Sequence, residues 1–202
     1  LQVTILDNLV SALEIIKLDL LSLDLDQPSN NPFEVELWLE CNKQIISLIS
    51  KVIQYDKSQQ PPALMEAYPM KLDTFVRLVH YICHLLDLSG AVHQNEPDNK
   101  LASLIIHHIR IKDFRDHMTQ IFETFIGILT LLQPSFFHQL LSLTMIDLLP
   151  KSNYRLFHNF FFTKILEKNL HILDFQSIFF ATLTDHFEEL MTPNPPSVLL
   201  EI

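Results

Sequence analysis

Apolar residues recur at steps of three and four along the first half of the chain, which is the period of an amphipathic helix. The pattern predicts three helices there, at about 3–23, 32–55 and 70–88. The breaks between helices are polar or proline-rich, at 24–32, 56–62 and 89–99, and Pro69 interrupts the approach to the third helix. Asn31 is the expected N-cap of the second helix and Pro32 its first residue.

The second half of the chain repeats this alternation at higher density. It predicts helices at about 101–109, 112–132, 136–149, 154–166 and 170–191, before a proline-rich exit at 193–196. Ser135 and Ser152 are expected to cap two of them after the helix-stopping Pro134 and Pro150. No stretch alternates apolar and polar residues between turn signals, so no strands are predicted.

Several predicted helices are apolar on more than one face, as in 160–162 and 178–180. Helices of this kind pack between neighbours, as in stacked helical repeats. We therefore expect an all-α fold, an irregular HEAT-like α-solenoid segment, with a compact helical bundle as the alternative. Residues 1–99 would form helical repeats with polar, proline-rich linkers, and 100–202 denser repeats of the same larger solenoid. The absence of an initiator Met and the apolar tail 198–202 indicate a cut from a longer polypeptide.

Glycine is the most informative residue type, because the chain has only two, Gly90 and Gly127. Phosphate-cradling loops and nucleophile elbows need glycine for their tight backbone turns. The common nucleotide-binding and hydrolase motifs are therefore excluded from this segment. Apolar residues make up 48% of the chain, which is ample for a buried core.

The formal net charge of −10 disfavours direct binding to nucleic acid, whose phosphates are neutralised by Lys and Arg. Cys41 and Cys83 fall on predicted helices among apolar neighbours, which suits a reducing compartment and gives no disulfide framework. The longest stretch without Asp, Glu, Lys or Arg, 124–146, has the length of a membrane span. Helix-breaking residues at 133–135 interrupt it, so no membrane partner is expected.

His80 and His84 lie four residues apart on one predicted helix, with Cys83 between them, and His107 and His108 follow. Such a pair can bind a metal, but a third ligand would have to come from elsewhere. No C-x-x-C or H-E-x-x-H motif supports one, and no Glu has a His three residues later, as di-iron bundles require. We therefore assign no catalytic, cofactor-binding or metal-binding residue and expect no enzyme activity.

Acidic side chains gather near the end of the last predicted helix, at Asp185, Glu188 and Glu189. We expect them to form a solvated helix face, and a basic partner is the sharper alternative. The aromatic stripes are expected to belong to the core, with ligand lining as the alternative.

The run 110–191 carries a family resemblance. Its ordered landmarks are Arg110-Ile111-Lys112 before a Phe-rich helix, Gln133-Pro134-Ser135-Phe136-Phe137, and Phe180-Ala181-Thr182-Leu183 before an acidic, Leu-rich helix. This order and spacing is similar to a segment of the N-terminal HEAT-repeat region of the TRRAP family, the transformation/transcription domain-associated proteins. The resemblance covers about 80 of the 202 residues.

The resemblance implies part of a very large PI3K-related pseudokinase without kinase activity. Members of that family are nuclear coactivator subunits of histone acetyltransferase complexes in chromatin regulation, and they bind transcription activators. We therefore expect a non-catalytic scaffold that works by protein–protein binding to other complex subunits and to activators. The alternatives are another HEAT-type scaffold, such as a nuclear transport receptor or an mRNA-decay scaffold, and a metal-binding helical-bundle enzyme.

Overall fold

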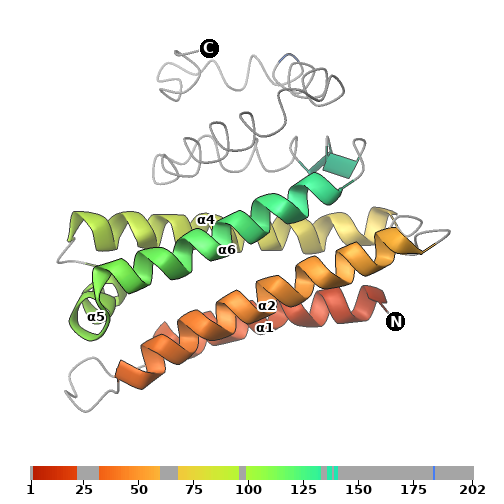
Figure 1. The fold of residues 1–202 in the computed structure, drawn as a ribbon. Coiled ribbons are helices and arrows are strands. Elements are labelled where there is room, and N and C mark those ends of the chain that lie inside the picture. The colour runs from red at the N-terminus through yellow and green to blue at the C-terminus, as the bar shows by residue number, and fades with distance from the viewer. Residues whose placement is uncertain are drawn as a thin grey trace.

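The computed structural model describes residues 2–21, 32–59, 68–95, 99–132, 136–137, 139–140 and 184. It contains α1 (Gln2–Leu21), α2 (Pro32–Ser58), α4 (Tyr68–Gln94), α5 (Lys100–His108) and α6 (Ile111–Leu131), shown in Figure 1. No strand occurs among the described residues, so the all-α prediction is confirmed. Pro32 is the first helical residue of α2, as predicted.

Two of the breaks predicted between helices begin later in the structure than the sequence pattern indicates. The loop predicted at 89–99 is helical as far as Gln94, and the linker predicted at 56–62 is helical as far as Ser58. Pro69 does not interrupt a helix either, because it lies in the first turn of α4, where its missing N–H is tolerated.

Burial explains the longer α4. Gly90 weakens a helix by about 1 kcal/mol relative to Ala. Ala91 and Val92, however, are buried in the core, and burying a side chain such as Val stabilises by about 1.5 kcal/mol or more. The helix ends only at Asn95, which adopts a left-handed backbone with φ 54° and donates its N–H to the carbonyl of Val92.

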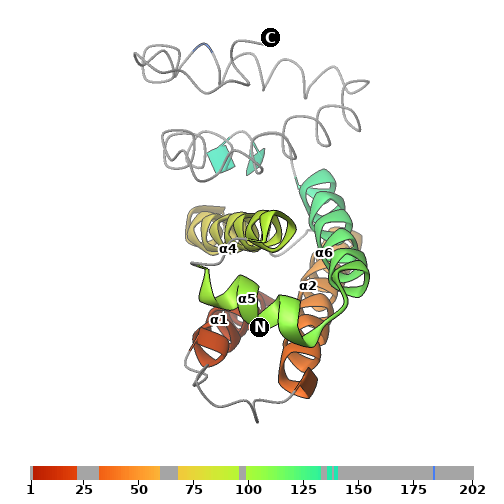
Figure 2. The same ribbon diagram turned by 90° about the vertical axis from the view of Figure 1, so that its left-hand side faces the viewer.

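The long helices form two antiparallel hairpins stacked on each other. The first hairpin is α1 with α2, and the second is α4 with α6, joined through the short α5 (Figure 2). Asn99 caps the N-terminus of α5, because its side chain accepts a hydrogen bond from the N–H of Ala102 at 3.0 Å.

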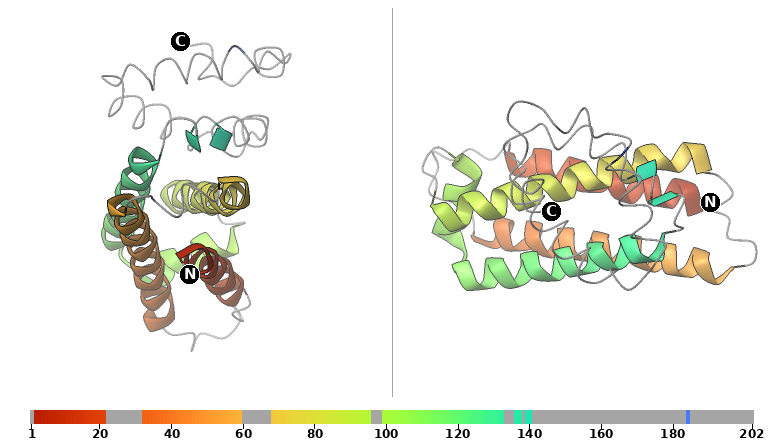
Figure 3. Two further views of the ribbon diagram at one scale, coloured as in Figure 1. Left: turned by 90° about the vertical axis from the view of Figure 1, so that its right-hand side faces the viewer. Right: turned by 90° about the horizontal axis from the view of Figure 1, so that it is seen from above.

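The two hairpins stack so that helices running in the same direction lie next to each other. In Figure 1, α1 and α4 run in one direction, and α2 and α6 run in the other. Helix α1 contacts α4, and α2 makes its most extensive contact with α6. The view from above in Figure 3 shows the four long helices lying lengthwise beside one another. Each helix of the first hairpin thus has a parallel neighbour in the second.

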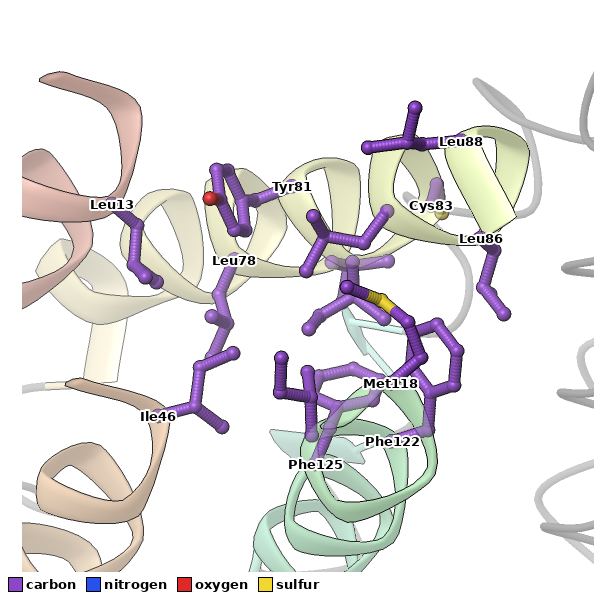
Figure 4. Close-up of a cluster of buried hydrophobic side chains, with 14 of the residues drawn as sticks. Leu13, Ile46, Leu78, Tyr81, Cys83, Leu86, Leu88, Met118, Phe122 and Phe125 are labelled. Carbon is purple, nitrogen blue, oxygen red and sulfur yellow. The ribbon is translucent and has the colours of Figure 1, made fainter. Parts of the chain in front are cut away.

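The core lies between the two hairpins and receives side chains from all four long helices. Figure 4 shows Leu13 of α1, Ile46 of α2 and Leu78 of α4 converging with Phe125 of α6. These four side chains are at most 1% exposed. The apolar positions that predicted the first helices supply this core. They include the buried side chains of Leu6, Val10, Leu39, Ile49, Ile53, Phe75, Val79, Ile82, Leu86, Phe114, Met118 and Ile121.

Helix α4 also carries apolar contacts beyond the two hairpins. The rings of Phe75 and Phe136 meet edge to face, with centroids 5.1 Å apart. Phe136, Phe137 and Leu140 are all buried. The predicted helices at 136–149, 154–166 and 170–191 otherwise lie outside the described residues, as does the proline-rich exit.

One helix in the described part of the chain is long and apolar enough to cross a membrane, Leu72–Gln94 of α4. Its most apolar window is 67% buried inside the fold, the burial expected of a core helix. The uncharged stretch predicted from the sequence is a different one. It is described only in part, and within it α6 ends at Leu131.

Candidate functional site

Polar side chains line one side of the contact between α1 and α4. We call this set the α1–α4 seam; it consists of Asp7, Ser11, Glu14 and Lys17 on α1 with Thr74, Arg77 and His84 on α4. The guanidinium of Arg77 donates from Nε to Oε1 of Glu14 at 3.1 Å and from Nη2 to Oε2 of the same carboxylate. Nη2 also donates to Ser11 Oγ at 3.1 Å. The hydrogen bond from Arg77 to Glu14 raises the pKa of Arg77.

The remaining seam contacts extend this pairing along both helices. One turn before Arg77 on α4 and two turns before Glu14 on α1, the hydroxyl of Thr74 donates to Oδ1 of Asp7. Beyond the ion pair, Lys17 lies close enough to His84 for its charge to act on the imidazole. Partners 67, 66 and 63 residues apart in sequence follow one another in the same order on the two helices. The contacts therefore require α1 and α4 to run parallel.

The far end of the seam contains ionisable groups with shifted pKa values. Burial, with a smaller contribution from the charge of Lys17, lowers the pKa of His84 to about 4. Burial raises the pKa of Asp87, one turn further along α4, to about 6. His84 Nε2 and Asp87 Oδ1 are buried and have no hydrogen-bond partner in the described part of the chain.

A second polar contact crosses the interior between α2 and α4. The phenol of Tyr81 donates to Oδ1 of Asn42, and Asn42 Nδ2 donates to the carbonyl of Trp38 at 2.8 Å. Asn42 is fully buried and Tyr81 is 4% exposed. Burial raises the pKa of Tyr81, against the effect of its bond with Asn42. This pair satisfies two polar groups inside an otherwise apolar core.

The histidines singled out in the sequence lie on two helices. His80 and His84 are half-buried on α4, whereas His107 and His108 lie near the end of α5, with His107 exposed. Among the residues that the structure describes, no three His, Cys, Asp or Glu side chains come together in a group that could hold a metal. Cys83 is buried and Cys41 is half-buried, and both are free thiols.

The other candidates from the sequence fall outside the described residues. These are the acidic cluster Asp185, Glu188 and Glu189 and the aromatic runs at 160–162 and 178–180.

The exposed apolar side chains gather on the first hairpin. Of the six exposed large apolar residues in the described ranges, five lie on α1 and α2 and are between 39% and 59% exposed. We call these five the outer face: Ile5, Ile15, Leu37, Leu48 and Tyr55. The sixth, Ile111, lies at the start of α6. Figure 2 shows α1 and α2 at one end of the stack. The outer face is thus a set of exposed apolar side chains on the hairpin at that end of the described array.

Sequence reasoning identified neither the seam nor the outer face. The outer face does leave a signal, because Leu37, Leu48 and Tyr55 are eleven and seven residues apart, close to whole numbers of helical turns. The seam leaves none, because its pairs lie more than sixty residues apart in sequence.

The chain matches no protein-family model, no curated protein and no solved structure. The site must therefore be interpreted from its geometry. Directional polar contacts fix how the two hairpins stack, and an apolar face at one end is open to solvent. This arrangement is suited to holding helices in register and to binding other proteins.

Proposed function

We propose that this chain is a non-catalytic scaffold, a segment of an irregular HEAT-like α-solenoid that acts by binding other proteins. The observation that carries the proposal is the like-on-like stacking of the hairpins, with α1 parallel to α4 and α2 parallel to α6. Repeat proteins stack their helix pairs in this way, so that each pair packs on its neighbour and long surfaces stay available for partners.

A closed four-helix bundle is the competing architecture. With short up-down-up-down connections, adjacent helices in such a bundle are antiparallel. The α1–α4 seam favours the stacked array over that bundle, because its ordered pairs, Asp7 with Thr74 and Glu14 with Arg77, need parallel neighbours. The contact of Phe136 with Phe75 of α4 also favours a stack, since it places apolar packing beyond the second hairpin.

The resemblance of 110–191 to the TRRAP family supplies the cellular context of the proposal. On that basis the scaffold belongs to a very large coactivator subunit of nuclear histone acetyltransferase complexes. Its partners are the other subunits of such a complex, with transcription activators as further ligands. The net charge of −10 supports protein partners over nucleic acid.

Co-purification tests this context. The protein is tagged in its native cells and isolated from nuclear extract, and the co-purifying proteins are quantified by mass spectrometry. The eluate is also assayed for acetyl transfer to histone peptides. The expected result is a near-stoichiometric set of acetyltransferase-complex subunits together with acetyltransferase activity.

A matched variant separates specific from adventitious capture. Leu78→Asp places a charge in the core, where Leu78 is 1% exposed, and is expected to abolish capture by disrupting the stack. Recovery of transport cargo or mRNA-decay factors in place of acetyltransferase subunits would assign the chain to one of the alternative solenoid scaffolds. Turnover or bound stoichiometric metal in the isolated protein would overturn the scaffold proposal itself.

A further inference from the structure

We infer that the outer face binds a second copy of this chain, with the two α2 helices antiparallel across a two-fold axis. This inference goes beyond the proposed function, and its failure would leave the scaffold proposal standing. It is carried by the clustering of exposed apolar side chains on the first hairpin and by the distribution of charge along α2.

The apolar evidence is the concentration of large side chains on one surface. Leu37, Leu48 and Tyr55 share one side of α2, while Ile46 and Ile53, roughly half a turn round the helix, face the core. The apolar positions run over 18 residues of helix, which corresponds to about 27 Å. A stripe of this length flanked by charged residues is typical of a helix-binding surface.

The charge evidence identifies the occupant. The acidic residues Glu34, Glu36 and Glu40 lie in the first half of α2. The basic residues Lys51 and Lys57 lie in its second half, where the acidic Asp56 is buried at 1% exposure, while Lys43 lies in the first half and forms an ion pair with Glu40. The exposed surface of α2 therefore carries a net negative charge in its first half and a net positive charge in its second half. Such a helix is complementary to a copy of itself laid antiparallel, which is the self-complementarity that a two-fold interface needs.

One antiparallel register satisfies the apolar and the charged positions together. An axis near the middle of α2 places Leu37 opposite Tyr55 of the second copy. The same register places Glu40, which also pairs with Lys43 of its own helix, opposite Lys51 of the second copy. A parallel arrangement would instead oppose like charges at both ends, which is unfavourable.

Sedimentation equilibrium of the full 202-residue chain tests the dimer. The wild-type chain is expected to show a concentration-dependent monomer–dimer equilibrium. Leu48→Glu puts a charge in the middle of the stripe and is expected to weaken the dimer by at least about tenfold. Ile111→Glu changes an equally exposed apolar residue on α6 and is expected to leave the dimer unchanged.

Charge exchange tests the register. Glu40→Lys alone and Lys51→Glu alone each oppose like charges twice in their own dimers. A mixture of the two variant chains restores both pairs. In the mixed dimer, the new Lys at position 40 of one chain faces the new Glu at position 51 of the other. The native Lys51 of the first chain faces the native Glu40 of the second. At low ionic strength each variant alone is expected to dimerise about tenfold more weakly than the mixture. Because the comparison is between variants, a small loss of helix stability in either one does not mimic it.

A wild-type chain that stays monomeric at every accessible concentration overturns the inference. So does a dimer that Leu48→Glu and Ile111→Glu weaken equally, since the contact would then lie elsewhere. A dimer whose affinity is the same for the single charge variants and for their mixture overturns the antiparallel register.

Discussion

The two junctions between the hairpins are built differently. The α1–α4 junction carries the polar seam, in which Arg77 makes two hydrogen bonds to Glu14 and Thr74 pairs with Asp7. The α2–α6 junction is the most extensive contact in the described fold, and the buried side chains of both helices are mostly apolar. Apolar burial is strong but non-directional, whereas hydrogen bonds are directional. The difference indicates that α2 and α6 supply most of the stacking energy, while the seam selects the parallel register.

The largest effect is expected in the apolar region. Phe125→Ala removes a ring that is 1% exposed and should lower the free energy of unfolding by about 3–5 kcal/mol. Urea denaturation followed by circular dichroism measures this change. Ile111→Ala on the same helix, where the side chain is 46% exposed, should cost less than about 1 kcal/mol. Similar losses for the two variants would contradict a core centred between the hairpins.

The buried pair of Tyr81 and Asn42 should give the next largest effect. Tyr81→Phe leaves Oδ1 of Asn42 without its donor in the core and should destabilise by about 1–3 kcal/mol. Combining it with Asn42→Leu removes both partners, so the double variant should lose less stability than the sum of the single variants. Strict additivity in this double-mutant cycle would show that the two side chains do not interact.

The seam itself should contribute less energy than either interior contact. Both side chains of the Arg77–Glu14 pair are partly exposed, at 33% and 41%, so water screens their attraction. The coupling free energy between Arg77→Met and Glu14→Gln is expected to be about 1 kcal/mol and to decrease at high salt. A coupling as large as that of the buried pair would reverse the assigned roles of the two regions.

The smallest effects concern pH at the end of the seam. The pKa of His84 is about 4 in the folded chain, below its ordinary 6.5, so the unfolded state binds more protons between these values. Stability contributed through His84 is therefore lost as the pH falls from 6.5 towards 4. As the pH falls over that range, the free energy of unfolding of His84→Gln should rise relative to that of wild type by under about 1 kcal/mol.

Asp87 should act in the opposite direction. Its pKa is about 6 in the folded chain, above its ordinary 3.8, so the folded state holds the proton longer as the pH rises. As the pH rises from about 4 to about 6, Asp87→Asn should therefore gain stability relative to wild type, again by under about 1 kcal/mol. Unfolding free energies of both variants across this range check the two signs. Parallel pH profiles for wild type and variants would show that these groups are not shifted.

Helical periodicity was sufficient to predict the class of the fold and most of its core. Positions such as Phe75, Ile82 and Met118 were expected on buried helix faces and are buried. The ends of helices were less predictable, because the burial of Val92 outweighs the helix-breaking tendency of Gly90, and only tertiary packing determines that balance. The seam could not be predicted either, since nothing local to Glu14 indicates a partner such as Arg77.

The central claim is that α1 and α4 lie parallel, with Asp7 beside Thr74, and site-directed cross-linking tests it most directly. In a background in which Cys41 and Cys83 are replaced by Ser and Ala, Asp7→Cys is combined with either Thr74→Cys or His84→Cys and treated with a short bifunctional thiol reagent. His84 lies ten residues further along α4 than Thr74, about 15 Å away. The stacked arrangement predicts efficient cross-linking of the pair at 7 and 74 and little of the pair at 7 and 84; the reverse result would contradict parallel stacking.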